Sequence, residues 1–195
     1  VFKELKDIFP SGIVHLGGDE APTELWEKCP LCRKARTKAG MKDEQEQMRA
    51  FFAKTTVLLA KNGQTPQFWY EGNAGIYHPG ETVYAWRQGQ ALQSIEKTKK
   101  AGLNLIMASS EYCYLDFPQI QGQRNWGWMK TTTLQKCYEL DPAFGKPEKE
   151  AGHIRGVHAP VWAERLPDLD HLLYRAYPRA CAIAEAGWSP MNVRS

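Results

Sequence analysis

The chain has 195 residues, of which 43% are hydrophobic and 24% are charged, and its formal net charge is +3 at pH 7. This is the composition of a folded globular protein and excludes a disordered chain. The small and evenly spread positive charge gives no basis for a nucleic-acid partner. No apolar run approaches the roughly 20 residues needed to cross a membrane, so no membrane association is expected.

Short β-branched or aromatic runs alternate with helical patterns along the chain. After an opening helix-to-strand connection, the predicted strands are residues 12–18, 65–72, 81–89, 103–109 and 154–164. The predicted helices are residues 43–63, 90–102 and 168–189, the last interrupted at Pro178, and residues 110–152 are expected to be irregular. This alternation predicts parallel βα units of the α/β class. Five such units make a little more than half of a (β/α)8 barrel, which typically needs about 250 residues.

Polar and aromatic side chains follow each predicted strand at its carboxyl end. They are Asp19 and Glu20, Trp69 and Glu71, Trp86 and Arg87, Ser109 to Glu111, and Trp162 and Glu164. Because α/β barrels and open α/β sheets place their sites at this end of the strands, we expect a functional site there. The seven Trp and eight Tyr residues favour a ligand with flat apolar faces, such as a sugar, although a single Trp is more often a core residue.

The segment IVHLGGDEAP, residues 13–22, ends a predicted strand on two glycines and two adjacent carboxylates. Gly17 and Gly18 permit a backbone turn that lets Asp19 and Glu20 reach one cavity. Two neighbouring carboxyl groups disfavour simultaneous ionisation, so one can stay protonated, as protonation of a glycosidic oxygen requires. In most glycosidases the general acid and the nucleophile lie on either side of the sugar, and two adjacent residues can hardly flank both faces of a sugar ring. The pattern therefore indicates substrate assistance, in which the 2-acetamido oxygen of the substrate is the nucleophile.

The same carboxylate pair would serve a different purpose in an ATPase, a metal site or a helix cap. An ATPase needs a phosphate-binding G-x-x-x-x-G-K-[ST] loop, which the sequence lacks. A metal site with His15 is disfavoured because His15 and Asp19 lie about 13 Å apart on an extended strand. Capping of a following helix by Asp19 and Glu20, with Pro22 at an early helical position, stays open as a purely structural alternative.

The five cysteines are an odd number, so they cannot form a complete set of disulfides within one chain. Cys29-Pro-Leu-Cys32 has the spacing of a zinc knuckle, but no second CxxC completes a four-ligand site. Free thiols are the expectation, with a local disulfide or a metal site as alternatives.

The segment HLGGDE, residues 15–20, resembles the signature of the family 20 glycoside hydrolases, the β-N-acetylhexosaminidases. The resemblance continues, in the order of the family, through FWYEG (68–72), VYAWRQG (83–89), EYCYLDF (111–117), VWAERL (161–166) and YPRACAIAEAGWS (177–189). It covers about residues 10–190. It implies a (β/α)8 TIM-barrel catalytic domain, with about strands 4 to 8 in this chain. Residues 1–195 are thus expected to be the C-terminal portion of that domain.

The resemblance also implies a reaction and its catalytic residues. A terminal β-linked GlcNAc or GalNAc is removed with retention through an oxazolinium intermediate, and no metal or cofactor is required. Glu20 is the general acid/base, Asp19 orients the acetamido group, and Tyr114 donates a hydrogen bond to the acetamido oxygen. The expected partners are β-N-acetylhexosaminide glycans.

Further residues are expected to bind the sugar. The resemblance assigns Asp116 and Glu164 to the sugar hydroxyls and Trp162 to the sugar face. Trp128, favoured over Trp126 by its distance from the LDP segment, is expected to be another pocket wall. Trp69 and Trp86 are also expected walls, with a place in the core as the alternative.

The chain departs from the family pattern because barrel strands 1 to 3, and an Arg that grips the sugar hydroxyls, are not in it. Half a barrel exposes sheet edges and apolar faces, so we expect either a fragment of a longer protein or a homo-oligomer that covers them. A non-catalytic sugar-binding or assembly module is the alternative function. An exported or lysosomal-type location follows only by analogy with the family.

Overall fold

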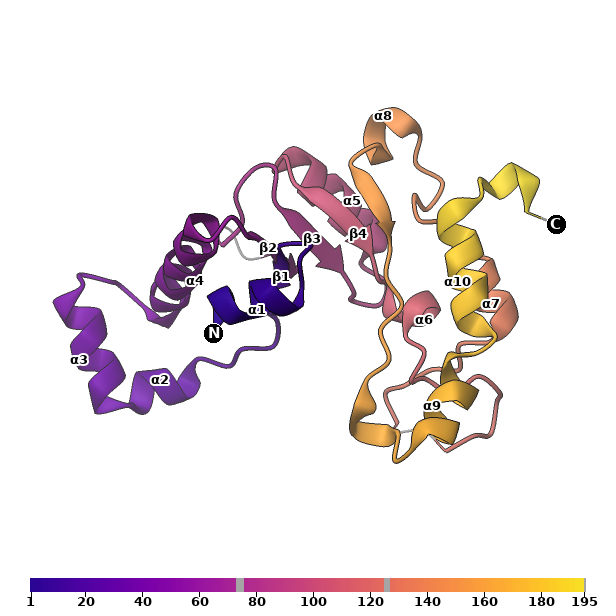
Figure 1. The fold of residues 1–195 in the computed structure, drawn as a ribbon, viewed down its shortest axis with the longest axis horizontal. Coiled ribbons are helices and arrows are strands. Elements are labelled where there is room, and N and C mark those ends of the chain that lie inside the picture. Colours follow the sequence, from indigo (N-terminus) through magenta and orange to yellow (C-terminus); the bar gives the residue numbers. More distant parts are fainter. Residues whose placement is uncertain (73–75, 125–126, 195) are drawn as a thin grey trace. The chain divides into compact units, whose positions relative to one another are not determined.

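In the first unit of the structure, Val1–Glu81, the described residues form two parallel strands and four helices (Figure 1). The structure is a computed structural model that describes residues 1–72, 76–124 and 127–194. The elements of this unit are α1 (Phe2–Ile8), β1 (Ile13–His15), α2 (Glu24–Lys28), α3 (Pro30–Lys38), α4 (Glu44–Lys61) and β2 (Thr65–Trp69). β1 pairs with β2 in parallel, in a register that runs from Ile13 opposite Thr65 to His15 opposite Gln67.

The helix α4 shows why the sequence folds this way locally. The Asp43 side chain accepts a hydrogen bond from the Glu46 amide at 2.7 Å, which satisfies one of the unpaired donors at the helix start. The helix buries Met48, Phe52, Thr55 and Leu59, whose spacing of three and four residues places them on one face. The Phe52 ring meets the Phe68 ring of β2 edge to face, with centroids 5.8 Å apart. This contact packs α4 against the strand that precedes a candidate site segment.

In the second unit, Thr82–Ser195, the part of the chain that the structure describes forms three parallel strands in the order β3, β4, β5. The strands are β3 (Thr82–Ala85), β4 (Asn104–Met107) and β5 (Ile154–Val157). The helices are α5 (Ala91–Lys100), α6 (Ser110–Cys113), α7 (Leu134–Tyr138), α8 (Glu148–Ala151), α9 (Leu169–Ala176) and α10 (Arg179–Trp188), with short 3-10 helices η1 (Ala163–Arg165) and η2 (Met191–Val193). Figure 1 shows α10 beside α7 at the C-terminal end of this unit.

The core of the second unit lies around β4. Val83, Leu105 and Met107 are fully buried, and α5 adds Ile95 and Thr98 from one of its faces. The two buried residues of β4, Leu105 and Met107, are apolar, which is typical of a parallel strand whose face is covered by a helix.

The parallel strands confirm the predicted α/β class, and each predicted strand and helix exists with shorter bounds. The predicted strand 154–164 is wrong beyond Val157, and its end contains η1 instead. The prediction that residues 110–152 are irregular is wrong where α6, α7 and α8 lie. These helices have four or five residues, too few for a periodic apolar pattern to be visible. No helix among the described residues is long and apolar enough to cross a membrane.

Candidate active site

The backbone after β1 turns through three residues in the left-handed region. Gly17 and Gly18 have φ angles of 74° and 96°, and Glu20 has a φ of 42°. Glycine adopts this region without cost, but a glutamate there is strained. A Cβ at Gly18 would lie 3.4 Å from the Phe52 ring, an ordinary van der Waals distance, so the φ angle rather than the space requires glycine there. The turn therefore accounts for both glycines, and it holds Glu20 in a conformation that folding alone does not favour.

Hydrogen bonds to β2 fix the start of this turn. The Leu16 amide donates to the Gln67 carbonyl at 2.8 Å, and the Trp69 amide donates to the Gly17 carbonyl at 2.9 Å. The Gly17 amide also donates to Nδ1 of His15 at 3.1 Å. The strand pairing thus continues up to the first glycine, and the chain leaves the sheet directly before the carboxylate pair.

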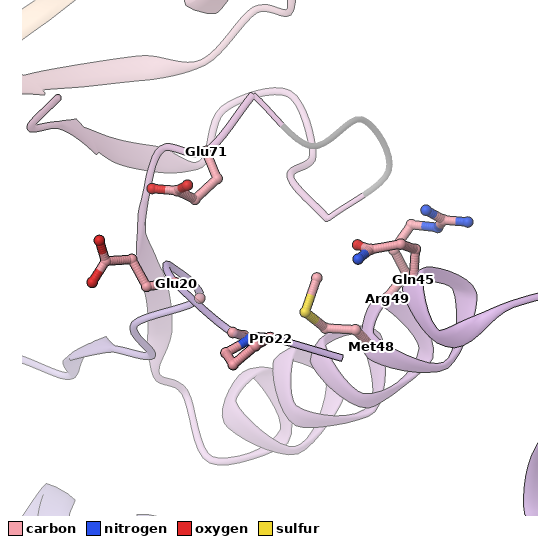
Figure 2. Close-up of a pocket in the computed structure, with 8 residues that line it drawn as sticks. Glu20, Pro22, Gln45, Met48, Arg49 and Glu71 are labelled. Atoms are coloured by element: carbon pink, nitrogen blue, oxygen red, sulfur yellow. The ribbon is translucent and has the colours of Figure 1, made fainter. Parts of the chain in front are cut away.

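Glu20 lines a pocket of about 690 Å³ within the first unit (Figure 2). Its walls come from three segments: the turn after β1, the end of β2 and the first turns of α4. The lining residues are Gly18, Glu20, Ala21, Pro22, Gln45, Met48, Arg49 and Glu71. In Figure 2, Glu20 and Glu71 lie on one side of this space, while the side chains of α4 lie on the other.

Tyr77 ties down the chain at the end of β2. Its hydroxyl donates to the Trp69 carbonyl at 2.9 Å and accepts from the Glu71 amide at 3.0 Å. Burial raises the pKa of Tyr77 to about 12, and the charges of Glu71 and Asp19 act in the same direction. Asp19 therefore lies within electrostatic reach of this hydroxyl. Sequence reasoning missed Tyr77, because a tyrosine that binds only main-chain groups has no recognisable motif.

The structural alternative for the carboxylate pair is wrong. α2 begins at Glu24, and the residue at its N-cap position is Thr23. Asp19, Glu20 and Pro22 all precede the helix, so they neither cap it nor form its first turn. Among the described residues, no three His, Cys, Asp or Glu side chains gather in a way that would hold a metal ion.

In the second unit, an aromatic group surrounds Tyr114. The Trp86 ring stacks on the Tyr114 ring at 6.5 Å with an interplanar angle of 14°, and the Trp162 ring lies 6.1 Å away. Tyr114 also packs with Phe117 and Met129 in a buried cluster. The fold of the second unit thus brings the expected hydrogen-bond donor, Tyr114, together with two expected pocket walls, Trp86 and Trp162.

The remaining tryptophans differ in exposure. Trp128 is 61% exposed, with its ring 5.3 Å from that of Phe117, and Trp162 is 37% exposed. Trp69 is only 8% exposed, and its ring lies 5.0 Å from that of His15. Trp126, the alternative to Trp128, lies outside the described residues.

Asp116 carries a buried carboxylate in the second unit. It is 2% exposed, and neither of its carboxylate oxygens has a hydrogen-bond partner among the residues that the structure describes. Burial raises the pKa of Asp116 to about 6, and the charge of Glu164 acts in the same direction. Nearby main-chain amides and the Arg179 guanidinium oppose this rise without cancelling it. Two acceptor oxygens that lack donors suit a ligand with hydroxyl groups.

Arg179 anchors the segment that carries Tyr114 and Asp116. It is fully buried, and its guanidinium donates to the carbonyls of Leu115, Thr132 and Arg175. Burial lowers the pKa of Arg179 to about 10. Leu115 stands between the two predicted site residues, so this bond holds both of their backbones. Sequence reasoning did not assign Arg179 a role; the available signal was an arginine directly before the run of small and apolar residues 180–184.

The sequence of the chain matches a known family over nearly its whole length. Residues 1–191 match the family described as glycosyl hydrolase family 20, catalytic domain. The chain is 95% identical over 195 residues to a beta-hexosaminidase of Akkermansia muciniphila, covering all of this chain and 40% of the relative. It therefore spans less than half the length of that curated relative.

Two solved structures give the same result for the fold. A crystal structure of a beta-N-acetylhexosaminidase, 95% identical in sequence, superposes with a TM-score of 0.95 over the whole chain and 41% of its own length. A mutant Streptomyces plicatus beta-hexosaminidase in complex with its product GlcNAc is 28% identical, with a TM-score of 0.76 over the whole chain and 36% of its own length. These matches, with the parallel βα order, confirm the predicted fold class: the chain is part of a (β/α)8 barrel.

Proposed function

The chain belongs to glycosyl hydrolase family 20, and from this we propose that it carries the acid/base function of an exo-acting β-N-acetylhexosaminidase. The proposed substrates are glycans that end in a β-linked GlcNAc or GalNAc at the non-reducing end. The observation that carries the proposal is the strained Glu20, which follows Asp19 directly and lines a pocket of about 690 Å³. Backbone strain of this kind clusters at functional sites.

The reaction follows from the chemistry of the two carboxyl groups. Glu20 protonates the glycosidic oxygen, which leaves with the remainder of the glycan. The oxygen of the 2-acetamido group attacks the anomeric carbon and forms an oxazolinium ion, while Asp19 orients and stabilises the acetamido nitrogen. Glu20, now ionised, then removes a proton from water as the water opens this ring. Two inversions at the anomeric carbon give net retention.

The second unit supplies the polar binding groups in this proposal. Tyr114 donates to the acetamido oxygen, and the carboxylates of Asp116 and Glu164 accept hydrogen bonds from sugar hydroxyls. Asp116 suits this role because its buried oxygens lack donors among the described residues. The tryptophan side chains provide apolar walls for the sugar ring: Trp69, Trp86, Trp128 and Trp162.

A chromogenic substrate tests the proposal directly. We expect the purified chain to release nitrophenol from nitrophenyl N-acetyl-β-glucosaminide, and Glu20→Gln to abolish this release. Glu24→Gln is the matched control, because it makes the same chemical change at an exposed position of α2 outside the pocket. Replacing the acetamido group of the substrate by trifluoroacetamido should slow the reaction strongly, because the carbonyl oxygen becomes a weaker nucleophile.

The outcomes separate the proposal from its alternative. Turnover that survives in Glu20→Gln would contradict the role of Glu20. Binding of GlcNAc without any turnover would favour a non-catalytic sugar-binding module. The absence of both would show that this chain does not form the site by itself.

We also propose that a second copy of the chain can cover its exposed apolar surfaces. In the second unit, Trp188 is 89% exposed, and Leu169 and Leu173 of α9 are 66% and 44% exposed. Exposed apolar side chains in such numbers are typical of surfaces that contact other protein. Light scattering coupled to size-exclusion chromatography tests this: a monomer at all concentrations would contradict the proposal.

A further inference from the structure

The cysteines of the Cys29-Pro-Leu-Cys32 segment lie at the start of α3. Cys29 is at the N-cap position, and its carbonyl accepts the first helical hydrogen bond from the Arg33 amide at 3.0 Å. Cys32 lies three residues further along, inside the first helical turn. In α-helical geometry, residues three apart have Cα atoms about 5 Å apart. This separation falls within the range of roughly 4.4–6.8 Å that a disulfide spans.

The two thiols are in contact and have different chemical environments. Their side chains form a hydrogen bond with each other, and both residues are partly exposed. The main-chain amides of Cys32 and Leu31 at the helix start, and the charge of Arg33, lower the pKa of Cys29. The bond to Cys29 raises the pKa of Cys32. Cys29 thus has the character of an attacking thiolate, and Cys32 that of the thiol which resolves a mixed disulfide.

The other three cysteines do not share this environment. Cys113 and Cys137 are fully buried, and burial raises the pKa of both thiols. Cys181 is exposed on α10. The pair in α3 is therefore distinguished by adjacency and exposure together.

The pair lies beside the candidate active site within the first unit. Arg36 of α3 forms an ion pair with Glu44 at 2.7 Å, and the Gln47 side chain donates to the Cys32 carbonyl at 3.4 Å, so α3 is bound to α4. Cys32 lines an apolar pocket of about 440 Å³, and two of its other lining residues, Ala21 and Met48, also line the pocket of Glu20. A covalent bond in α3 would therefore form in a wall next to this pocket.

We propose that Cys29 and Cys32 are a modification site, at which a low-molecular-weight disulfide oxidises the two thiols to an intramolecular disulfide. The Cys29 thiolate attacks one sulfur of the reagent, forms a mixed disulfide and releases the first reagent thiolate. Cys32 loses its proton, and its sulfur attacks the Cys29 sulfur and displaces the second reagent thiolate. The two protein thiols supply two electrons, and the reagent leaves as two thiols. This inference goes beyond the proposed hydrolase function and does not depend on it.

Peptide mapping tests the site, because trypsin cleavage after Lys28 and Arg33 releases both cysteines in one peptide, residues 29–33. The full chain is incubated with oxidised glutathione under native conditions, alkylated in denaturant and digested. We expect the peptide to become two hydrogen atoms lighter and to lose both alkylation sites, while Cys113 and Cys137 stay alkylatable. Cys181→Ser should leave this result unchanged and remove any glutathione adduct on that residue.

Single-cysteine variants test the attacking role of Cys29 and the resolving role of Cys32, and a sample in urea tests whether the disulfide needs the native fold. Cys32→Ser should retain glutathione on Cys29 as a stable mixed disulfide, and Cys29→Ser should form an adduct on Cys32 more slowly. A glutathione adduct on Cys181 of the wild-type chain shows that the reagent was active. If both cysteines of the 29–33 peptide are still alkylated in such a chain, the proposal is wrong. A glutathione adduct on Cys29 that never resolves in the wild-type chain, or a disulfide that forms only in urea, would also overturn it.

Discussion

Replacing Asp116 by asparagine should stabilise the protein at neutral pH and weaken sugar binding. The carboxyl group is 2% exposed and its oxygens have no donor among the described residues, so the folded state disfavours its ionised form. Its pKa rises from the ordinary 3.8 to about 6 in the folded protein. The folded state therefore binds a proton more readily than the unfolded state between these two pH values.

The sign and size of the effect follow from this linkage. Because the folded state holds the proton more tightly, stability contributed by Asp116 is present below pH 3.8 and is lost as the pH rises to about 6. At about 1.4 kcal/mol per pKa unit, the full loss is about 3 kcal/mol. Asparagine does not ionise, so Asp116→Asn should recover most of this free energy at pH 7.5 and little of it at pH 4. Its buried amide still lacks partners, which makes about 3 kcal/mol an upper bound.

Urea unfolding of wild type and Asp116→Asn at pH 4 and pH 7.5, followed by tryptophan fluorescence, measures the difference. Asp170→Asn is the control, because it removes an exposed carboxylate of α9 and should change the unfolding free energy by less than about 0.5 kcal/mol. Equal effects of Asp116→Asn at both pH values, or destabilisation at pH 7.5, would refute the reasoning. Either result would mean that donors satisfy the carboxylate in solution.

Three further substitutions test other parts of the structure by urea unfolding. Glu20→Gly should be more stable than Glu20→Ala by about 1 kcal/mol, because only glycine adopts a φ of 42° without strain; equal stabilities would mean that the turn relaxes. Tyr77→Phe should lower the unfolding free energy by about 1–2 kcal/mol, because the Trp69 carbonyl loses its donor; an unchanged value would show that water replaces the hydroxyl. Arg179→Met should cost about 3 kcal/mol or more, because the Leu115 carbonyl and its neighbours stay buried without donors, and a smaller loss would contradict its anchoring role.

The order of strands and helices could be predicted because it depends on local patterns. The apolar spacing in α4 and its Asp43 cap are visible in the sequence, and the structure has the helix within two residues of the predicted bounds. Short helices could not be predicted in this way. α7 has five residues, and it begins where the Thr133 side chain accepts from the Lys136 amide at 3.1 Å. One capping bond is a weak signal without a periodic pattern behind it.

The site was predictable where function depends on residue type, and not where it depends on distant main-chain groups. The glycines and carboxylates of residues 17–20 stand together in the sequence, so their chemistry could be argued directly. Arg179 binds carbonyls that lie 47 and 64 residues earlier in the chain. Its partners are main-chain atoms, which every residue possesses, so no sequence pattern reports them. Such a contact emerges only once the fold brings α10 against the segment of Leu115.

Two features, one in each unit, oppose stability, and each has a role in the proposed reaction. Glu20 is held at a positive φ that glycine would occupy without strain, and Asp116 is a buried carboxylate that asparagine would replace at lower cost. Other carboxylates of this chain form structural contacts, as Asp43 does at the cap of α4 and Glu44 does with Arg36. Proteins retain locally unfavourable choices mainly where function requires them. The free-energy cost at these two positions is therefore an argument for the site that is independent of family resemblance, and it predicts that the stabilising substitutions are the inactivating ones.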